Sequence, residues 1–168
     1  WFIDDGDIII SATENGQTVK QGDKDAVEDA APVIKQNEQN NSSTATDKTI
    51  KIETTGDATA DVTIEDVNIS SKGDAIDVGS SSEITLEGDN KIFSESGSAL
   101  HVSDGDVTID GDGSLEAATD SNSKNAQIGS HENEKMSGII HITGNATVTT
   151  QDDNARADDH IGGAGIGS

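Results

Sequence analysis

The feature that most constrains this sequence is a repeat of short apolar segments, grouped in threes, that begins after Asp61. Apolar and polar residues alternate within each segment, as in a β-strand, and turns rich in Gly, Asp, Asn and Ser separate the segments. Three short strands in a repeat of about 22 residues predict an all-β fold, a right-handed parallel β-helix or β-solenoid, in which each coil stacks on the one before. The four repeats cover residues 62–64, 67–69 and 75–78; 84–86, 91–93 and 99–102; 107–109, 115–117 and 126–128; and 140–142, 147–149 and 164–166.

The register between repeats follows from the spacing of one apolar residue in each segment. These residues are 22, 23 and 33 positions apart in the first segments, 23, 23 and 33 in the second, and 24, 28 and 38 in the third. We therefore expect three columns of stacked side chains, with the added length in the loops of the third and fourth repeats. The columns comprise Ile64, Leu86, Ile109 and Ile142; Ile69, Ile92, Leu115 and Val148; and Ile76, Leu100, Ile128 and Ile166.

Composition alone would favour disorder. Only 30% of the residues are hydrophobic, 2% are aromatic, and the formal net charge is -23. Such a chain often buries too little surface to offset the entropy that it loses on ordering. A β-helix has a narrow core, however, and a few inward side chains per strand fill it while polar residues alternate outward. The order of the apolar residues therefore favours a folded domain.

The first 60 residues are less regular, and we assign them to an irregular first coil or cap of one domain that spans residues 1–168. Strands are expected at residues 7–10, 32–35 and 50–52. Pro32 suits the start of a strand, where its missing N–H is not needed. Residues 21–31 form either one helical turn or a loop, and the polar run 36–46 is a loop.

The stretches 62–70, 84–90 and 105–115, closed by Ala-Gln-Ile-Gly at 126–129 and Ala-Gly-Ile-Gly at 164–167, resemble repeats of large surface proteins of Gram-positive, often gut or clostridial, bacteria. They are also similar to a bacterial carbohydrate-binding domain family whose members form right-handed β-helices. The resemblance covers about residues 60–168 and is more specific for architecture than for ligand. It implies a cell-surface or extracellular protein that binds plant cell-wall or other acidic polysaccharides with calcium. No ligand motif is matched position by position, so the ligand-binding residues stay unknown.

The charge of the chain narrows its partners. Asp and Glu number 33 against 10 Lys and Arg, so the chain repels phosphate backbones and anionic lipid headgroups. We expect no nucleic acid partner, and no apolar run is long enough for membrane insertion. With no cysteine, stability outside the cell has to come from packing or bound ions. The start at Trp1, without a signal peptide, predicts a piece of a larger multidomain protein.

Calcium is the cofactor that the acidic turns predict. Asp104 and Asp106, and then Asp110 and Asp112, form Asp-Gly-Asp turns on either side of one predicted strand. Carboxylates on flexible turns are the hard oxygen ligands that calcium needs. The alternative is that Asp-Gly is simply good turn chemistry.

A second candidate metal site is the acidic run 152–160, which opens with Asp152 and Asp153 and contains the sole arginine, Arg156. A polysaccharide lyase would need calcium-binding carboxylates beside a cationic base, and this run is the one place in the sequence that combines them. A solvated loop whose arginine neutralises its neighbours is the simpler interpretation. We therefore predict no catalytic residues and no enzyme.

The remaining chemically active side chains show no recognisable motif. The four histidines lack a metal-binding spacing, and His101 and His141 are expected to point into solvent from the middle of strands. Aromatic stacking, a common route to sugar binding, has only Trp1, Phe2 and Phe93 available. A stacking platform is therefore expected near the N-terminus or not at all.

Three functions are compatible with such a module. We predict a non-catalytic extracellular module that binds a polysaccharide or a host or cell-wall glycan, with the help of calcium. The alternatives are a structural stalk or adhesin spacer that retains no glycan, and an enzyme similar to a polysaccharide lyase. Retention on a polysaccharide, and the appearance of unsaturated sugar ends, distinguish the three.

Overall fold

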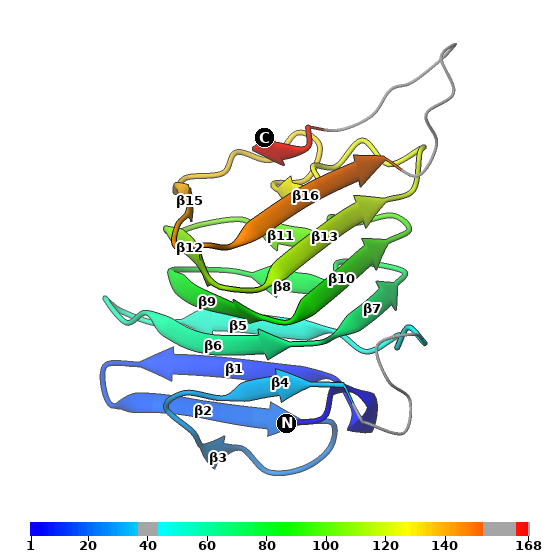
Figure 1. Ribbon diagram of the computed structural model, residues 1–168. Helices are drawn as coiled ribbons and strands as arrows, with labels where there is room; N and C mark the ends of the chain where they lie inside the picture. Colours follow the sequence, from blue (N-terminus) through cyan, green and yellow to red (C-terminus); the bar gives the residue numbers. More distant parts are fainter. Residues whose placement is uncertain (37–43, 153–163, 168) are drawn as a thin grey trace.

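The computed structural model describes residues 1–36, 44–152 and 164–167, and it is all-β apart from one turn of 3-10 helix, η1 (Ile3–Asp5) (Figure 1). The N-terminal strands are β1 (Ile8–Thr13), β2 (Gly16–Gln21), β3 (Val27–Glu28), β4 (Val33–Lys35) and β5 (Ile50–Thr54). The strands of the repeats are β6 (Ala60–Glu65), β7 (Asn68–Ser71), β8 (Ile76–Val78); β9 (Ser82–Glu87), β10 (Asp89–Ser94), β11 (Leu100–Val102); β12 (Val107–Gly111), β13 (Ser114–Thr119), β14 (Ile128–Gly129); and β15 (Ile140–Ile142), β16 (Thr147–Asp152), β17 (Ile166–Gly167). No helix in these ranges is long and apolar enough to cross a membrane.

The repeats distribute their strands over three sheets in a fixed order. The first strand of each repeat joins a five-stranded sheet, the second a four-stranded sheet, and the third an eight-stranded sheet. Neighbouring repeats pair in parallel in all three sheets, so the strands lie in layers from β6 to β17 (Figure 1). The predicted three strands per repeat are therefore present, with each repeat as one layer of the stack.

The third predicted column is confirmed and extends beyond the repeats. Its members are paired in register along the eight-stranded sheet, and the column begins in the N-terminal strands β1 and β5. All but the last member are fully buried, and burying a side chain of this size contributes about 1.5–3 kcal/mol to stability. The column is Ile8, Ile50, Ile76, Leu100, Ile128 and Ile166.

The other two predicted columns are wrong at one step, between the second and third repeats. The predicted pairing there is displaced by two residues in both sheets, although the remaining steps are confirmed. The observed partners are Gly111 for Leu86 and Ala117 for Ile92, in place of Ile109 and Leu115. A displacement of two residues keeps every side chain on its own face, so alternation of apolar and polar residues cannot detect it.

An antiparallel hairpin closes the N-terminal end of the stack. The strands expected at residues 7–10, 32–35 and 50–52 are present as β1, β4 and β5. The sequence analysis missed β2, which pairs antiparallel with β1, and β3, which pairs antiparallel with β2. Because β3 lies within residues 21–31, the helical turn proposed for that stretch is wrong. Of the polar run 36–46, residues 37–43 lie outside the described residues.

Candidate functional site

A polar column crosses the outer face of the eight-stranded sheet. Strand β8 turns Ile76 and Val78 into the core, so Asp77 between them faces outward. The residue in register with Asp77 on β11 is His101, and the next one, on β14, is Gly129. Because the sheet is parallel and in register, an acid, an imidazole and a position without a side chain lie side by side.

The segment that follows β14 folds back over His101. A turn closed by a hydrogen bond from the backbone N–H of Glu134 to the carbonyl of His131 (3.1 Å) includes Asn133 at φ 65°. The His131 ring stacks on that of His101, with centroids 3.9 Å apart and planes inclined by 6°. His101 is consequently only 7% exposed, and the expectation that it points into solvent is wrong.

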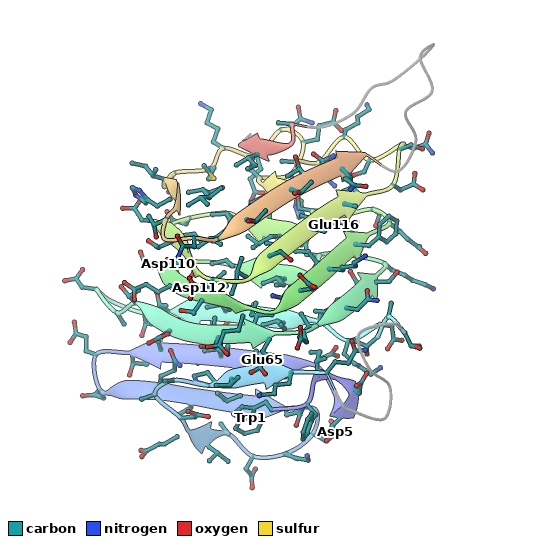
Figure 2. The ribbon with its side chains drawn as sticks, in the orientation of Figure 1. Trp1, Asp5, Glu65, Asp110, Asp112 and Glu116 are labelled. Carbon is teal, nitrogen blue, oxygen red and sulfur yellow. The ribbon has the colours of Figure 1, made fainter. Side chains whose placement is uncertain are left out.

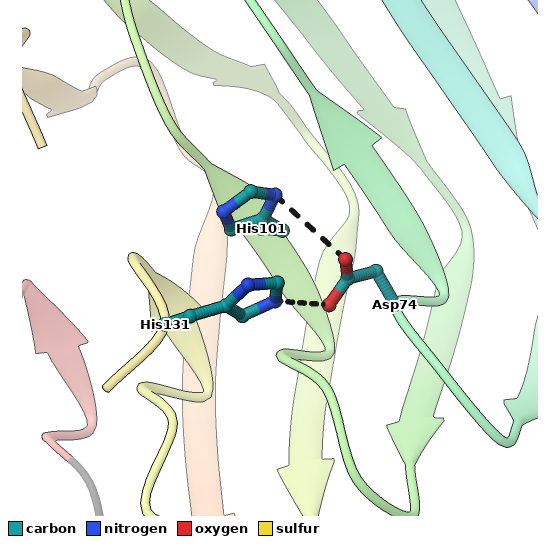
Figure 3. A group of neighbouring side chains, drawn as sticks. All are labelled: Asp74, His101 and His131. Carbon is teal, nitrogen blue, oxygen red and sulfur yellow. Dashed lines mark hydrogen bonds and ion pairs between the residues drawn. The ribbon is translucent and has the colours of Figure 1, made fainter. Parts of the chain in front are cut away.

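Three carboxylates surround the stacked rings, and each makes a close contact with a ring nitrogen. Figure 3 shows one of them, Asp74, with the two rings. Nδ1 of His101 lies 2.8 Å from Oδ1 of Asp77, and its Nε2 lies 2.7 Å from Oε2 of Glu134. Nε2 of His131 lies 2.7 Å from Oδ1 of Asp74. The Asp74 carboxylate also faces His101, whose Nδ1 is 3.7 Å from Oδ2. The five residues form one cluster drawn from three successive repeats.

Asp74 is fixed by the turn of the next repeat. Its Oδ1 accepts a hydrogen bond of 2.8 Å from the backbone N–H of Ser98. Gly97 passes so close beneath that a Cβ atom there would lie 2.7 Å from the backbone nitrogen of Asp74. A glycine is therefore required at this position for the two turns to pack, and their packing orients the Asp74 carboxylate toward the rings.

The charges of the cluster support one another. Burial of the ring lowers the pKa of His101, but the hydrogen bonds to Asp77 and Glu134 outweigh burial and raise it to about 9. The hydrogen bond from His101 lowers the pKa of the Asp77 carboxyl and, likewise, that of Glu134. In the ion-free cluster, His101 is therefore an imidazolium held between two carboxylates at neutral pH.

The donor set of this cluster suits a metal ion. Asp74, His101 and His131 each offer a ligand atom, and these atoms lie within 4.8 Å of one another. Within residues 1–36, 44–152 and 164–167, these three are the one group of three or more His, Cys, Asp or Glu side chains that meets this condition. The sequence analysis did not propose any of the three as a ligand.

The Asp-Gly-Asp turns predicted to bind calcium lie apart from this cluster. Asp104 and Asp106 precede β12, whereas Asp110 and Asp112 lie at its end, near the corner with β13 (Figure 2). A strand rises about 3.3 Å per residue, so the two turns are separated by roughly 13 Å and do not form one site. All four residues are exposed.

Each of these two turns instead bonds to the repeat that follows. Asp106 accepts a hydrogen bond of 2.9 Å from the backbone N–H of Ile139, and Asp112 accepts one of 2.8 Å from the side chain of Asn145. Asp104 accepts one from the Ser137 hydroxyl. These contacts agree with the turn-chemistry alternative, and calcium binding there stays a prediction.

The second predicted metal site falls mostly beyond the described ranges. The backbone of Asp152 ends β16, where it pairs with Thr119 of β13. Asp153 and Arg156, and with them the proposed lyase site, lie outside the described residues.

The outer face of the four-stranded sheet carries a shallow hollow of about 210 Å³. Phe93 of β10 lies on its floor, in register with two small residues, Ser70 of β7 and Ala118 of β13. Lys91 and Glu116, which form an ion pair of 3.6 Å, lie on the same face, where Figure 2 shows Glu116 on the outside of β13. The sequence analysis expected a stacking platform only near the N-terminus, and it did not predict one at Phe93.

Three comparisons with known proteins found no relative of this chain. No family model, no curated protein and no solved structure matches it.

Proposed function

We propose that this chain is a right-handed β-helix module that binds glycans without catalysis, in a secreted or surface-displayed protein. The fixed order of three parallel sheets supports the helical path, because each repeat must pass once around the core before it pairs with the next. Connections between parallel strands are right-handed in the great majority of proteins, which supports the hand.

The observation that carries glycan binding is the position of Phe93. An aromatic ring flanked in register by a serine and an alanine keeps part of its surface open on an otherwise polar sheet. Sugars bind in this way to proteins, with one apolar face against an aromatic ring and their hydroxyl groups on polar side chains. Lys91 and Glu116 are placed to supply such polar contacts.

The charges at the hollow favour an uncharged glycan over an acidic one. Lys91 and Glu116 neutralise each other locally, although the whole chain carries a net charge of -23. An uncharged, hydroxyl-rich polysaccharide therefore meets no repulsion at Phe93. An acidic polysaccharide, which the family resemblance implies, would need a bridging cation such as calcium.

The test compares Phe93→Ala with Phe2→Ala, since these are the two phenylalanines of the chain. Phe2 is 43% exposed at the N-terminal end of the stack, whereas β10 lies between β7 and β13, so truncation of Phe2 is a matched control. Affinity electrophoresis against a β-linked glucan and a polygalacturonate, each with and without millimolar calcium, measures retention. We expect wild-type and Phe2→Ala protein to be retained and Phe93→Ala to bind at least tenfold more weakly, a loss of about 1.4 kcal/mol.

The other outcomes separate the alternatives. Retention that is equal in Phe93→Ala and wild type would contradict the Phe93 site. No retention on any glycan would favour the structural stalk. Release of unsaturated sugar ends from the polygalacturonate would favour a lyase.

A further inference from the structure

We propose that Asp74, His101 and His131, with Asp77 as the fourth ligand, form a zinc site that joins three successive repeats. The proposal rests on the cluster at the eight-stranded sheet and is independent of glycan binding at Phe93. It concerns a different ion and different residues from the calcium turns.

The geometry places three donors, one each from Asp74, His101 and His131, within 4.8 Å of one another at one edge of the stacked rings, and Asp77 lies next to His101. Nδ1 of His101 and Nε2 of His131 both face the Asp74 carboxylate, at 3.7 and 2.7 Å (Figure 3). Asp77 lies 2.8 Å from His101 Nδ1. Zinc bonds of 2.0–2.1 Å in a tetrahedron set neighbouring donor atoms about 3.3 Å apart. The separations of Asp74 from the two rings lie on both sides of that value, so small rotations of these three side chains suffice to enclose an ion. Asp77, which lies outside this group, has to turn toward the ion to complete the tetrahedron.

At the opposite edge of the rings, Glu134 supplies the carboxylate that metal-binding histidines usually contact with their second nitrogen. Oε2 of Glu134 lies 2.7 Å from Nε2 of His101 and 3.7 Å from Nδ1 of His131. Histidines that bind a metal usually donate their other N–H to a carboxylate, which fixes the tautomer and the ring orientation. Glu134 therefore leaves Nδ1 of His101 as its ligand atom, and Nε2 of His131 is the nitrogen of that ring that lies against Asp74.

The electrostatics favour a divalent cation in this position. Three carboxylates approach the pair of rings, which stack at 3.9 Å. One divalent ion at the Asp74 edge would balance the charge of two of these carboxylates. The sole lysine in register with Asp77, Lys51, is paired with Glu53 at 3.2 Å.

The ligand chemistry selects a transition metal. Imidazole nitrogen with carboxylate oxygen in a four-ligand set suits Zn²⁺, whereas Ca²⁺ takes six to eight oxygen ligands. An open hollow of about 390 Å³ borders Asp74. His101 is buried beneath the His131 ring, so the completed site would be held against the sheet.

The test uses tag-free, chelator-treated protein of the full chain. Competition with a chromogenic chelator measures the affinity and stoichiometry of Zn²⁺, and Co²⁺ substitution gives the visible absorption of a four-coordinate site. The variants are His131→Ala and Glu134→Gln, which change half-exposed side chains of a surface turn. The matched control is His141→Ala, an exposed histidine of β15 that lies outside the cluster.

We expect one tightly bound zinc per wild-type chain and per His141→Ala chain, and an intense cobalt spectrum from both. His131→Ala should lose at least a hundredfold in affinity, and Glu134→Gln about 10–100-fold. Circular dichroism confirms that the variants are folded before titration. Zinc bound equally well by folded His131→Ala protein would overturn the site, as would a wild-type cobalt spectrum without four-coordinate absorption. If His131→Ala does not fold, the cobalt spectrum of the wild-type protein and the zinc affinity of Glu134→Gln decide the test.

Discussion

The side chain of Asn90 accepts a hydrogen bond of 3.1 Å from the backbone N–H of Val67, one repeat below it. Its amide group donates to the carbonyls of Glu87, in its own repeat, at 3.0 Å, and of Ser114, one repeat above, at 3.1 Å. Asn90 is 1% exposed and faces the core side of the sheet, next to the apolar column of Ile69, Ile92 and Ala117. One buried amide therefore satisfies backbone groups of three successive repeats at a corner of the stack.

Replacement of Asn90 should lower the free energy of unfolding by more than the size of its side chain suggests. In Asn90→Ala, the three backbone groups lose their partner at a buried corner, and an unsatisfied buried group costs about 1–3 kcal/mol. We expect a loss of about 3 kcal/mol in the free energy of unfolding, measured by urea denaturation. Asn145→Ala removes an exposed side-chain bond to Asp112 and should cost less than about 1 kcal/mol. Similar losses in the two variants would contradict the role of Asn90.

Gly111 of β12 packs closely against the backbone of Leu86 in the second repeat. Its φ is +110°, and a Cβ atom there would overlap the carbonyl oxygen of Leu86 and lie 2.8 Å from the nitrogen of Leu86. Gly111→Ala should therefore destabilise the fold by more than about 3 kcal/mol. Gly73→Ala is the control, because its Cβ would meet nothing within 4 Å and its φ is not positive. Thermal unfolding of both variants makes the comparison, and equal melting temperatures would be inconsistent with it.

Strand positions could be predicted from the sequence because alternation and turn residues are local signals. Register was predicted correctly at every step of the third column, but in the other two columns it failed at the step from the second to the third repeat. Leu86 pairs with Gly111 because the step from the second to the third repeat is two residues longer than the spacing of apolar residues implies. Pairing with Ile109 would have kept the same faces inward, so no hydrophobic pattern separates the two registers.

A disulfide can measure that register directly, since the chain has no cysteine of its own. Lys91 and Glu116 are in register on the outer face, about 4.8 Å apart between Cα atoms, which a disulfide can span. Lys91→Cys with Glu116→Cys should therefore oxidise to a crosslink in the folded chain. Lys91→Cys with Ser114→Cys tests the register expected from the apolar spacing, and here the separation is about 8 Å, too far to bridge. Mobility on a non-reducing gel distinguishes the two, and a crosslink in the second pair alone would refute the observed register.

Only part of the candidate metal cluster could be predicted from the sequence. The step of 24 residues from Ile76 to Leu100 is correct, and it also places Asp77 beside His101. The contribution of His131 and Glu134 could not be predicted, because it depends on a turn that folds back over a neighbouring strand. The alternation of apolar and polar residues along a strand carries no information on the path of such a turn. Phe93 was missed for a related reason, since its open surface depends on small residues in two other repeats.

Calcium binding by the Asp-Gly-Asp turns can be tested without disturbing the turns themselves. Asp110→Asn with Asp112→Asn keeps oxygen atoms that accept the existing hydrogen bonds but removes two charges that calcium needs. If the turns bind calcium, ten times its Kd should stabilise wild-type protein by about 1.4 kcal/mol, or roughly 4 °C in melting temperature. The double variant should lose most of this shift.

The control for this comparison is Asp23→Asn with Asp25→Asn, an exposed pair with the same spacing in the N-terminal cap. It changes the net charge by the same amount, so it reproduces any general screening of the -23 charge by calcium. A calcium shift that both double variants lose equally would indicate screening alone. The absence of any shift in wild-type protein would leave the turns with the structural role that their bonds to Ser137, Ile139 and Asn145 already give them.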